Sequence, residues 1–220
     1  MTKEPAASME EAIEAGLKML EIRAPNAAVT ALADHLALVA EWNRAYNLSA
    51  VREPDEMVVR HVLDSAAALP FLRGTRMLDA GSGAGFPGLV LALLAPETVW
   101  VLAESNGKKA RFLDHALRRL VLSGRVSVHR GRLENYHPAP GFDTVTARAL
   151  ADLATLAAWS APLLAPAGRL VALKGRRAEI ETECAALAPE WRVQVLPVVV
   201  PWLAAERHIV VLERERETET

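Results

Sequence analysis

Two kinds of hydrophobic pattern divide the chain near residue 70. Before that point, apolar residues recur at intervals of three and four, which is the spacing of amphipathic helices. After it, short apolar runs bounded by turn residues alternate with helical stretches, as they do in α/β proteins. The pattern predicts an N-terminal helical cap at 1–70 that belongs to the same domain, a sheet-containing part at 71–213 and a frayed tail at 214–220.

Three helices are expected in the cap. Ser8 and Glu11 have the spacing of a capping box and are followed by apolar residues at helical intervals. A second helix follows Pro25. A third begins at Pro54, where two acidic residues suit the positive end of the helix dipole, and runs to about Leu69.

The remainder of the chain predicts a sheet with helices on both faces. Strands are expected near 77–80, 98–103, 125–129, 143–147, 169–173, 191–200 and 208–212. Helical segments are expected at 88–94, 108–122, around 134, at 151–164 and at 179–187. Strands that alternate with helices form a mostly parallel, doubly wound sheet. The last two strands must be antiparallel, because the short loop around Pro201 cannot make a parallel crossover.

The first strand runs into residues 81–88, Gly-Ser-Gly-Ala-Gly-Phe-Pro-Gly, which we call the glycine turn. Glycines adopt backbone angles closed to other residues and let a ligand approach the main chain. Gly83, Gly85 and Gly88 satisfy the dinucleotide pattern G-x-G-x-x-G, so that pattern alone does not exclude an NAD enzyme. However, Gly81 lies closest to the strand and follows Asp79, and Asp-x-Gly-x-Gly-x-Gly is typical of S-adenosylmethionine-dependent methyltransferases. A turn without a ligand is a third interpretation.

The seven-stranded sheet with its C-terminal hairpin also favours the Rossmann-like class I methyltransferase fold over the dinucleotide fold. Three further positions lie at expected strand ends. Glu104 stands about 20 residues past the glycine turn, where a carboxylate accepts hydrogen bonds from both ribose hydroxyls, unless it is only a solvated acid. Backbone groups of Leu133 and Glu134 lie where this fold places adenine. Arg148 follows the fourth strand and either points into the crevice or makes a surface ion pair.

Composition limits the class of protein. The 220 residues carry a formal net charge of −2, which argues against a general nucleic-acid coat protein, so a nucleic-acid partner would have to meet a local basic face. No run approaches the roughly 20 apolar residues that cross a bilayer, and the N-terminus lacks a signal-peptide pattern, so we expect a cytoplasmic protein without a membrane partner. Cys184 is the single cysteine, and no metal site is expected.

The chain resembles the bacterial glucose-inhibited division protein B family, methyltransferases that modify N7 of a guanine in 16S ribosomal RNA. The resemblance covers residues from about 40 to 212 and extends to the first 40 only in helical character. Leu133 stands where the family more often carries a smaller residue. The matching segments are Trp42-Asn-Arg-Ala-Tyr-Asn-Leu-Ser49, Arg60-His-Val-Leu-Asp-Ser65, Leu78-Asp-Ala-Gly-Ser-Gly-Ala-Gly-Phe-Pro-Gly88, Glu104-Ser-Asn-Gly-Lys-Lys109, Arg111-Phe-Leu113, Ala147-Arg-Ala149, Leu173-Lys-Gly175 and Glu206-Arg-His-Ile-Val210.

The resemblance implies S-adenosyl-L-methionine as cofactor. It assigns the cofactor contacts Gly81, Phe86, Leu133, Glu134 and Arg148, although Phe86 by itself is as readily a helix-packing residue. The residues add the further candidates Asp79, Ser82, Gly83, Gly85, Glu104 and Ser105.

No catalytic residue is expected. Guanine N7 carries a lone pair and no proton at neutral pH, so its methylation requires positioning and no general base. In agreement, the chain has no Asn/Asp-Pro-Pro-Tyr segment after the fourth strand, which a methyltransferase acting on an exocyclic amine would use.

Candidate RNA contacts lie on the matching segments and near the crevice rim. They are Asn43, Asn47, Arg60, His61, Lys174, Arg207 and His208. Each has a structural alternative: the asparagines as a helix C-cap and turn, Arg60 with Asp64 as a salt bridge one helical turn apart, His61 as a packed histidine, and the basic residues as a solvated face. As phosphate contacts, Lys174 and Arg207 would bind 16S RNA in the small ribosomal subunit or its precursor.

Other functions stay open. A monomeric RNA guanine-N7 methyltransferase is the first interpretation, and a small-molecule methyltransferase is the second. An NAD-dependent oxidoreductase would need an ordered Ser/Tyr/Lys set after the fourth strand, which the sequence lacks. An RNA-binding assembly factor that retains the cofactor without turnover is not tested by the sequence.

Overall fold

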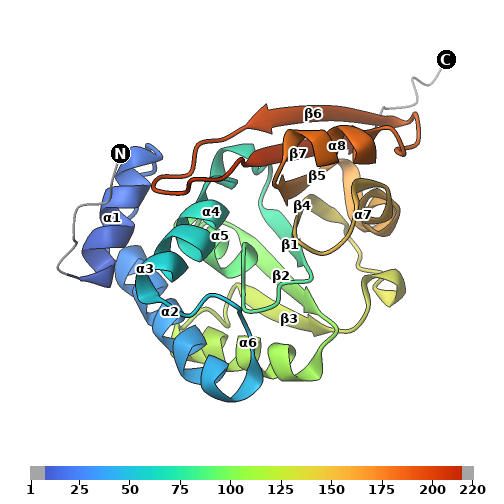
Figure 1. Cartoon of the computed structure of the whole chain (residues 1–220). Helices are drawn as coiled ribbons and strands as arrows, with labels where there is room; N and C mark the ends of the chain where they lie inside the picture. The colour runs from blue at the N-terminus through green and yellow to red at the C-terminus, as the bar shows by residue number, and fades with distance from the viewer. Residues whose placement is uncertain (1–7, 215–220) are drawn as a thin grey trace.

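The computed structural model describes residues 8–214 and contains one seven-stranded sheet (Figure 1). The strands lie in the order β3-β2-β1-β4-β5-β7-β6. Their bounds are Arg76–Ala80 for β1, Val99–Glu104 for β2, Val126–Arg130 for β3, Phe142–Arg148 for β4, Leu164–Lys174 for β5, Trp191–Pro197 for β6 and His208–Arg214 for β7. β1 to β5 are parallel, whereas β7 runs antiparallel to both of its neighbours, so the expected mixed sheet with a C-terminal hairpin is confirmed.

Three strand boundaries differ from the expectation by more than one residue. β5 begins at Leu164 and not near residue 169, because pairing with β4 continues beyond an irregularity between Phe142 and Thr144. β6 ends at Pro197 and not at residue 200. β7 reaches Arg214, which pairs with β6, so the expectation that the tail frays from residue 214 is wrong at that position. The other tail residues, 215–220, lie outside the described residues.

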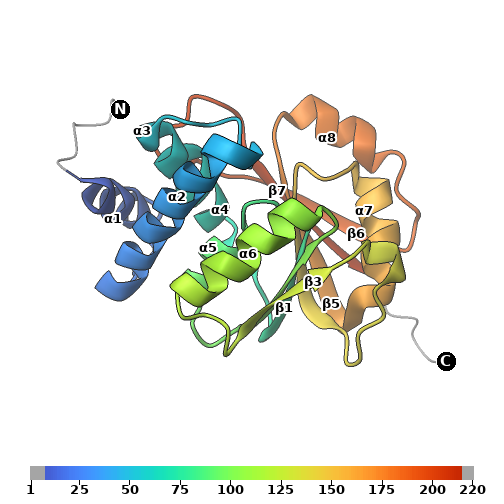
Figure 2. The same cartoon turned by 90° about the horizontal axis from the view of Figure 1, so that it is seen from below.

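Helices cover both faces of the sheet (Figure 2). One face carries α5 (Gly88–Leu94), α6 (Gly107–Arg119) and the cap helices α1 (Met9–Met19) and α2 (Asn26–Tyr46). The other carries α7 (Leu153–Ser160), α8 (Arg177–Cys184) and a short 3₁₀ turn at Leu133–Asn135. None of the helices within residues 8–214 combines the length and the apolar character that a membrane crossing would need.

The cap and the sheet share one core. Leu32 and Leu36 of α2 are fully buried in the same cluster as Trp100 of β2 and Phe112 of α6. At the N-terminus, the Ser8 hydroxyl accepts from the Glu11 N–H and the Glu11 carboxylate from the Ser8 N–H, which is the expected capping box. The first 70 residues thus bury their apolar stripe against the face of the sheet that carries α5.

The third cap helix departs from the expected continuous α-helix. It consists of α3 (Pro54–Met57), a π-helical segment η1 (Val58–Leu63) and α4 (Asp64–Ala66), followed by a 3₁₀ turn at Leu69–Phe71. π-helical turns are wider than α-helical turns and recur at functional sites. Here the wide turn contains two of the candidate RNA contacts, and their surroundings differ from those that α-helical spacing predicts.

Candidate active site

The glycine turn begins where β1 ends. Gly81, Gly83 and Gly85 have φ values of +68°, +57° and +91°, a region that side chains with a Cβ rarely adopt. A Cβ on Gly81 would also lie 2.6 Å from the side chain of Leu150, in the loop after β4. The turn therefore needs glycine for its backbone angles, and at Gly81 for space as well.

Asp79 holds the turn from its buried side. Its side chain has no exposed surface, and its two carboxylate oxygens accept from the Gly88 N–H at 3.0 Å and from the Thr146 hydroxyl at 2.8 Å. A Cβ on Gly88 would lie 2.5 Å from that of Asp79. Burial raises the pKa of Asp79 to about 6, and the hydrogen bonds oppose this shift. Asp79 therefore fixes the start of α5 against the end of β1.

Hydrogen bonds also hold Ser82 in the glycine turn and Glu104 at the end of β2. The Ser82 hydroxyl donates to the carbonyl of Asp79 at 3.0 Å. The carboxylate of Glu104 accepts from the Gly83 N–H at 2.9 Å and from the Asn106 N–H at 2.7 Å. Each carboxylate oxygen accepts more than one hydrogen bond, so Glu104 keeps capacity for hydroxyl donors. Ser105 follows with an exposed side chain.

The third and fourth strands complete this edge. Leu133 is buried and Glu134 exposed at the 3₁₀ turn that follows β3. Nearby, the rings of Tyr136 and His129 stack with centroids 3.8 Å apart. Because β3, β2, β1 and β4 are parallel neighbours, the residues that follow them lie along one edge of the sheet. Among residues 8–214, no three His, Cys, Asp or Glu side chains are grouped so as to hold a metal ion.

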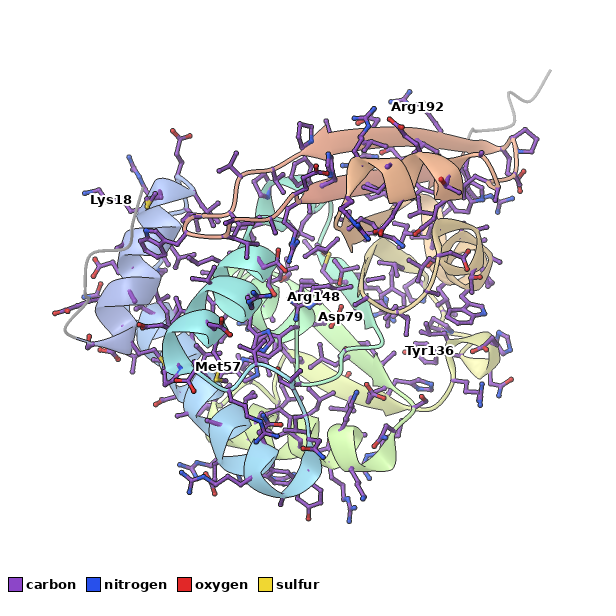
Figure 3. All side chains as sticks on the ribbon, in the orientation of Figure 1. Lys18, Met57, Asp79, Tyr136, Arg148 and Arg192 are labelled. Carbon is purple, nitrogen blue, oxygen red and sulfur yellow. The ribbon has the colours of Figure 1, made fainter. Side chains whose placement is uncertain are left out.

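Arg148 lies at the end of β4, and Figure 3 labels it near Asp79. Its guanidinium is part of a cluster of charged side chains. Its Nη1 donates to the carbonyl of Arg60 at 2.8 Å and to Asp64 at 3.2 Å, and Asp64 also accepts from Arg207 at 2.8 Å. We call Asp64, Arg148 and Arg207 the arginine cluster. The Arg148 and Asp64 side chains are only 17% and 8% exposed, so this ion pair is largely buried. Burial lowers the pKa of Arg148, and Asp64 opposes the shift.

The alternative interpretation of Arg60 and Asp64 as a salt bridge is wrong. Asp64 pairs with Arg148 and Arg207, and the side chain of Arg60 is exposed. The four-residue spacing allows such a pair but does not decide it, and here the Asp64 carboxylate has two other guanidinium partners. The Arg60 backbone carbonyl, and not its side chain, reaches the arginine cluster.

Phe86 and His61 form a ring stack behind the glycine turn. The Phe86 side chain is buried, its ring lies 4.3 Å from that of His61, and the Arg148 guanidinium lies 5.5 Å from the ring centre. His61 Nε2 is 2.7 Å from the Ser49 hydroxyl. Burial lowers the pKa of His61 to about 4, with a smaller contribution from Arg148. Both rings thus have packing contacts within the protein, and the cofactor contact of Phe86 stays a prediction.

The two candidate asparagines also bond within the protein. Asn43 is buried, and its amide donates to the Ser49 carbonyl at 2.8 Å and accepts from the Ser49 N–H at 3.0 Å. Asn47 ends α2 as a left-handed C-cap with φ of 47°, and its side chain accepts from Arg52 at 3.3 Å. These contacts are those of the structural alternative, a cap and a turn.

Two basic candidates at the far strand ends have internal partners too. Lys174 Nζ donates to the carbonyl of Ala151 at 2.9 Å and to Glu183 at 2.7 Å. His208 is buried, with Nδ1 2.8 Å from the carbonyl of Gly175. Of the expected RNA contacts, Arg60 has the most accessible charge.

Sequence reasoning missed two residues of this region. Thr146, which bonds Asp79, lies within a strand and resembles any other β-branched strand residue. His35 of α2 is fully buried and reaches the glycine turn from the cap. Its position three residues after Leu32, beside the apolar stripe of α2, is the one signal that it faces inward.

Comparison with known proteins identifies the family of the chain. A family model described as rRNA small subunit methyltransferase G (GidB) matches residues 28–210. A protein named ribosomal RNA small subunit methyltransferase G from Xanthomonas euvesicatoria pv. vesicatoria (strain 85-10) is 44% identical over 210 residues, covering 95% of this chain and 97% of that protein. One of the same name from Cupriavidus necator is 41% identical over 224 residues, covering 94% of this chain and 96% of that protein.

Solved structures share the fold at low identity. A putative O-methyltransferase from Klebsiella pneumoniae has a TM-score of 0.60 at 13% identity, covering 92% of this chain and 97% of that chain. An O-methyltransferase from Bacillus cereus, solved in complex with SAH, also has a TM-score of 0.60, at 16% identity, covering 94% of this chain and 100% of that chain. The expected class I methyltransferase fold is therefore confirmed.

Proposed function

Because this chain belongs to the rRNA small subunit methyltransferase G family, whose members methylate ribosomal RNA with S-adenosyl-L-methionine, we propose that it methylates N7 of a guanine in 16S ribosomal RNA, at position 527 of the reference numbering. The observation that carries the proposal is the family match over residues 28–210, which contains the glycine turn, Glu104 and the arginine cluster. The small-molecule alternative has no comparable support.

The residues at the strand ends fit the cofactor. Gly81 presents backbone without a Cβ, and Glu104 keeps acceptor capacity for the two ribose hydroxyls beside the exposed Ser105. Backbone groups at Leu133 and Glu134 would lie along the adenine, and Arg148 would border the methionine part. When bound, S-adenosyl-L-methionine supplies a methyl group activated on a sulfonium. The chain's own contribution is to hold that group at the edge of the sheet and to exclude water.

The polar groups around the glycine turn suit a methyl acceptor, such as guanine N7, that has no proton to lose. Both oxygens of Asp79 accept hydrogen bonds from the protein, and Glu104 is bonded to two backbone N–H groups. His61 faces the Ser49 hydroxyl. These groups are occupied in holding the turn and the helices, so in this mechanism they position the reactants and do not act as a general base.

We place the RNA at the side of the site that carries the arginine cluster. Arg60 is the first candidate for a phosphate contact, because its side chain is exposed while its backbone touches Arg148. The other expected contacts, Asn43, Asn47, His61, Lys174, Arg207 and His208, would have to exchange internal bonds for RNA. The proposed partner is the small ribosomal subunit or its precursor, bound by a cytoplasmic monomer.

The test uses small ribosomal subunits from a strain that lacks the modification. The purified protein and S-adenosyl-L-methionine with a labelled methyl group are added, and the labelled nucleotide is mapped by mass spectrometry. We expect label on N7 of one guanine, lost with Gly81→Val and kept with Gly124→Val, since nothing lies within 4 Å of a Cβ at Gly124. Cofactor binding without label in RNA would instead indicate a non-catalytic assembly factor.

A further inference from the structure

One residue of the helical cap reaches the backbone of the glycine turn. His35 of α2 is fully buried, and its Nε2 lies 2.8 Å from the carbonyl oxygen of Ala84. A Cβ added to Gly85 would lie 3.1 Å from the same ring. The turn thus has a contact with a helix 49 residues earlier in the chain.

The protonation of His35 follows from this geometry. A carbonyl oxygen only accepts, so Nε2 must carry the proton and donate it. Burial lowers the pKa of His35 to about 4, so the ring is neutral near pH 7 and Nδ1 is bare. Within residues 8–214, buried Nδ1 has no hydrogen-bond partner. A buried polar atom without a partner is unfavourable, so packing alone would be better served by an apolar ring at this position.

The His35 ring also extends the stack behind the turn. Its centroid lies 4.8 Å from that of Phe86, whose ring stacks on His61 at 4.3 Å. On the sheet side, Glu104 and Asp79 accept from the N–H groups of Gly83 and Gly88. The segment between these two anchors contains Ala84, whose carbonyl is held from the cap.

We propose that His35 is a positioning residue of the cofactor site, whose hydrogen bond to Ala84 selects the turn conformation that binds S-adenosyl-L-methionine. A turn with three positive-φ glycines has many alternative conformations in reach. The apparent dissociation constant rises as the binding-competent fraction falls, so loss of one anchor weakens binding without contact between His35 and the ligand. This inference rests on the proposed placement of the cofactor at the glycine turn.

Three variants separate the hydrogen bond from the packing. His35→Phe keeps a ring and loses the donor, whereas His35→Gln places an amide N–H close to the position of Nε2. His115→Phe is the matched control, because His115 is half-buried on α6, with its ring 5.2 Å from that of Trp42. Titration calorimetry with S-adenosyl-L-methionine and steady-state methylation of ribosomal subunits measure cofactor affinity, KM and kcat.

We expect His35→Phe to raise the cofactor Kd and KM about tenfold at unchanged kcat, the size of one lost hydrogen bond. His35→Gln should recover most of that loss, and His115→Phe should leave Kd unchanged. Unchanged affinity in His35→Phe, or an equal loss in His35→Phe and His115→Phe, would overturn the proposal. Equal losses in His35→Phe and His35→Gln would do the same, because the donor would then be irrelevant.

If His35→Phe does not fold, His35→Asn replaces it, since its shorter amide falls short of Ala84 while His35→Gln reaches. The result also separates this inference from the proposed function. Should Gly81→Val abolish cofactor binding while the His35 variants bind normally, the cofactor site stands and the role of His35 fails. Should Gly81→Val bind normally, the placement of the cofactor fails first.

Discussion

The glycine turn and the arginine cluster lie at the same edge of the sheet but are held by different means. In the turn, the carboxylates of Asp79 and Glu104 accept from backbone N–H groups, so the main chain sets the geometry. In the arginine cluster, Arg148 and Arg207 meet Asp64 side chain to side chain. A turn that is anchored at several backbone groups is held in one conformation, whereas charged side chains can exchange partners. In the function proposed above, the glycine turn and Arg148 would hold the cofactor, and the exposed Arg60 beside the cluster would meet the RNA.

The largest expected effect concerns the stability contribution of the arginine cluster. Asp64→Asn removes the carboxylate that Arg148 and Arg207 share and leaves the largely buried Arg148 guanidinium without its ion-pair partner. We expect the free energy of unfolding, measured in urea, to fall by about 4 kcal/mol. Asp34→Asn, at an exposed position of α2, is the control and should change little. Equal losses of stability in the two variants would show that the ion pairs of Asp64 do not stabilise the fold.

The two regions also differ in how far the sequence predicts them. The glycine turn was identifiable because its residues are contiguous and three of its four glycines have a local backbone reason. The arginine cluster was not, because Asp64 and Arg148 are 84 residues apart, and Asp64 and Arg207 are 143 apart. The helical spacing suggested Arg60 as the partner of Asp64, whereas two arginines that are distant in the sequence take that place in the fold.

The same distinction holds across the fold. The order of strands and helices followed from local periodicity, and the antiparallel hairpin followed from loop length. Side-chain partners across the fold did not follow, as with Lys174 and Glu183 or His35 and Ala84. Those pairs depend on how elements pack, which a single sequence does not encode locally.

The stack behind the turn predicts acid sensitivity. The pKa of His35 falls from 6.5 in the unfolded chain to about 4 in the fold, so the unfolded state binds more protons between these values and stability drops as the pH falls from 6.5 to 4. The loss approaches about 3 kcal/mol for this ring. Asp79 acts in the opposite direction, because its pKa is raised to about 6, and its contribution to stability is lost as the pH rises through 6.

Urea unfolding of the protein and of His35→Phe at pH 7 and pH 4.5 measures this contribution. His35→Phe should be clearly less sensitive to acid than the unaltered protein, with His61 accounting for much of the sensitivity that is left, since its pKa is also lowered to about 4. An identical pH dependence in both would mean that His35 titrates in the fold as it does in the unfolded chain.

The backbone-set geometry of the glycine turn makes it intolerant of a methyl group. Gly81→Ala places a Cβ at a φ of +68° and 2.6 Å from Leu150. Since Leu150 is a flexible side chain, the backbone angle is the larger obstacle, and we expect cofactor affinity to fall by about 2 kcal/mol, roughly thirtyfold. Gly124→Ala, with open space around its Cβ, is the matched control in calorimetry. Normal affinity in Gly81→Ala would place the cofactor elsewhere.

The smallest effect tests whether the buried carboxylate of the turn depends on one side-chain donor. Thr146→Val keeps the shape and removes the hydroxyl that donates to Asp79 at 2.8 Å, so about 1 kcal/mol of stability should be lost at pH 8. The hydroxyl favours the charged carboxylate, so its removal raises the pKa of Asp79 further, and the loss should shrink when unfolding is measured at pH 5. Thr155→Val removes a hydroxyl that donates to Asp152 at the exposed start of α7 and should show no such pH dependence. A loss in Thr146→Val that is equal at both pH values would mean that the Thr146 hydroxyl does not influence the pKa of Asp79.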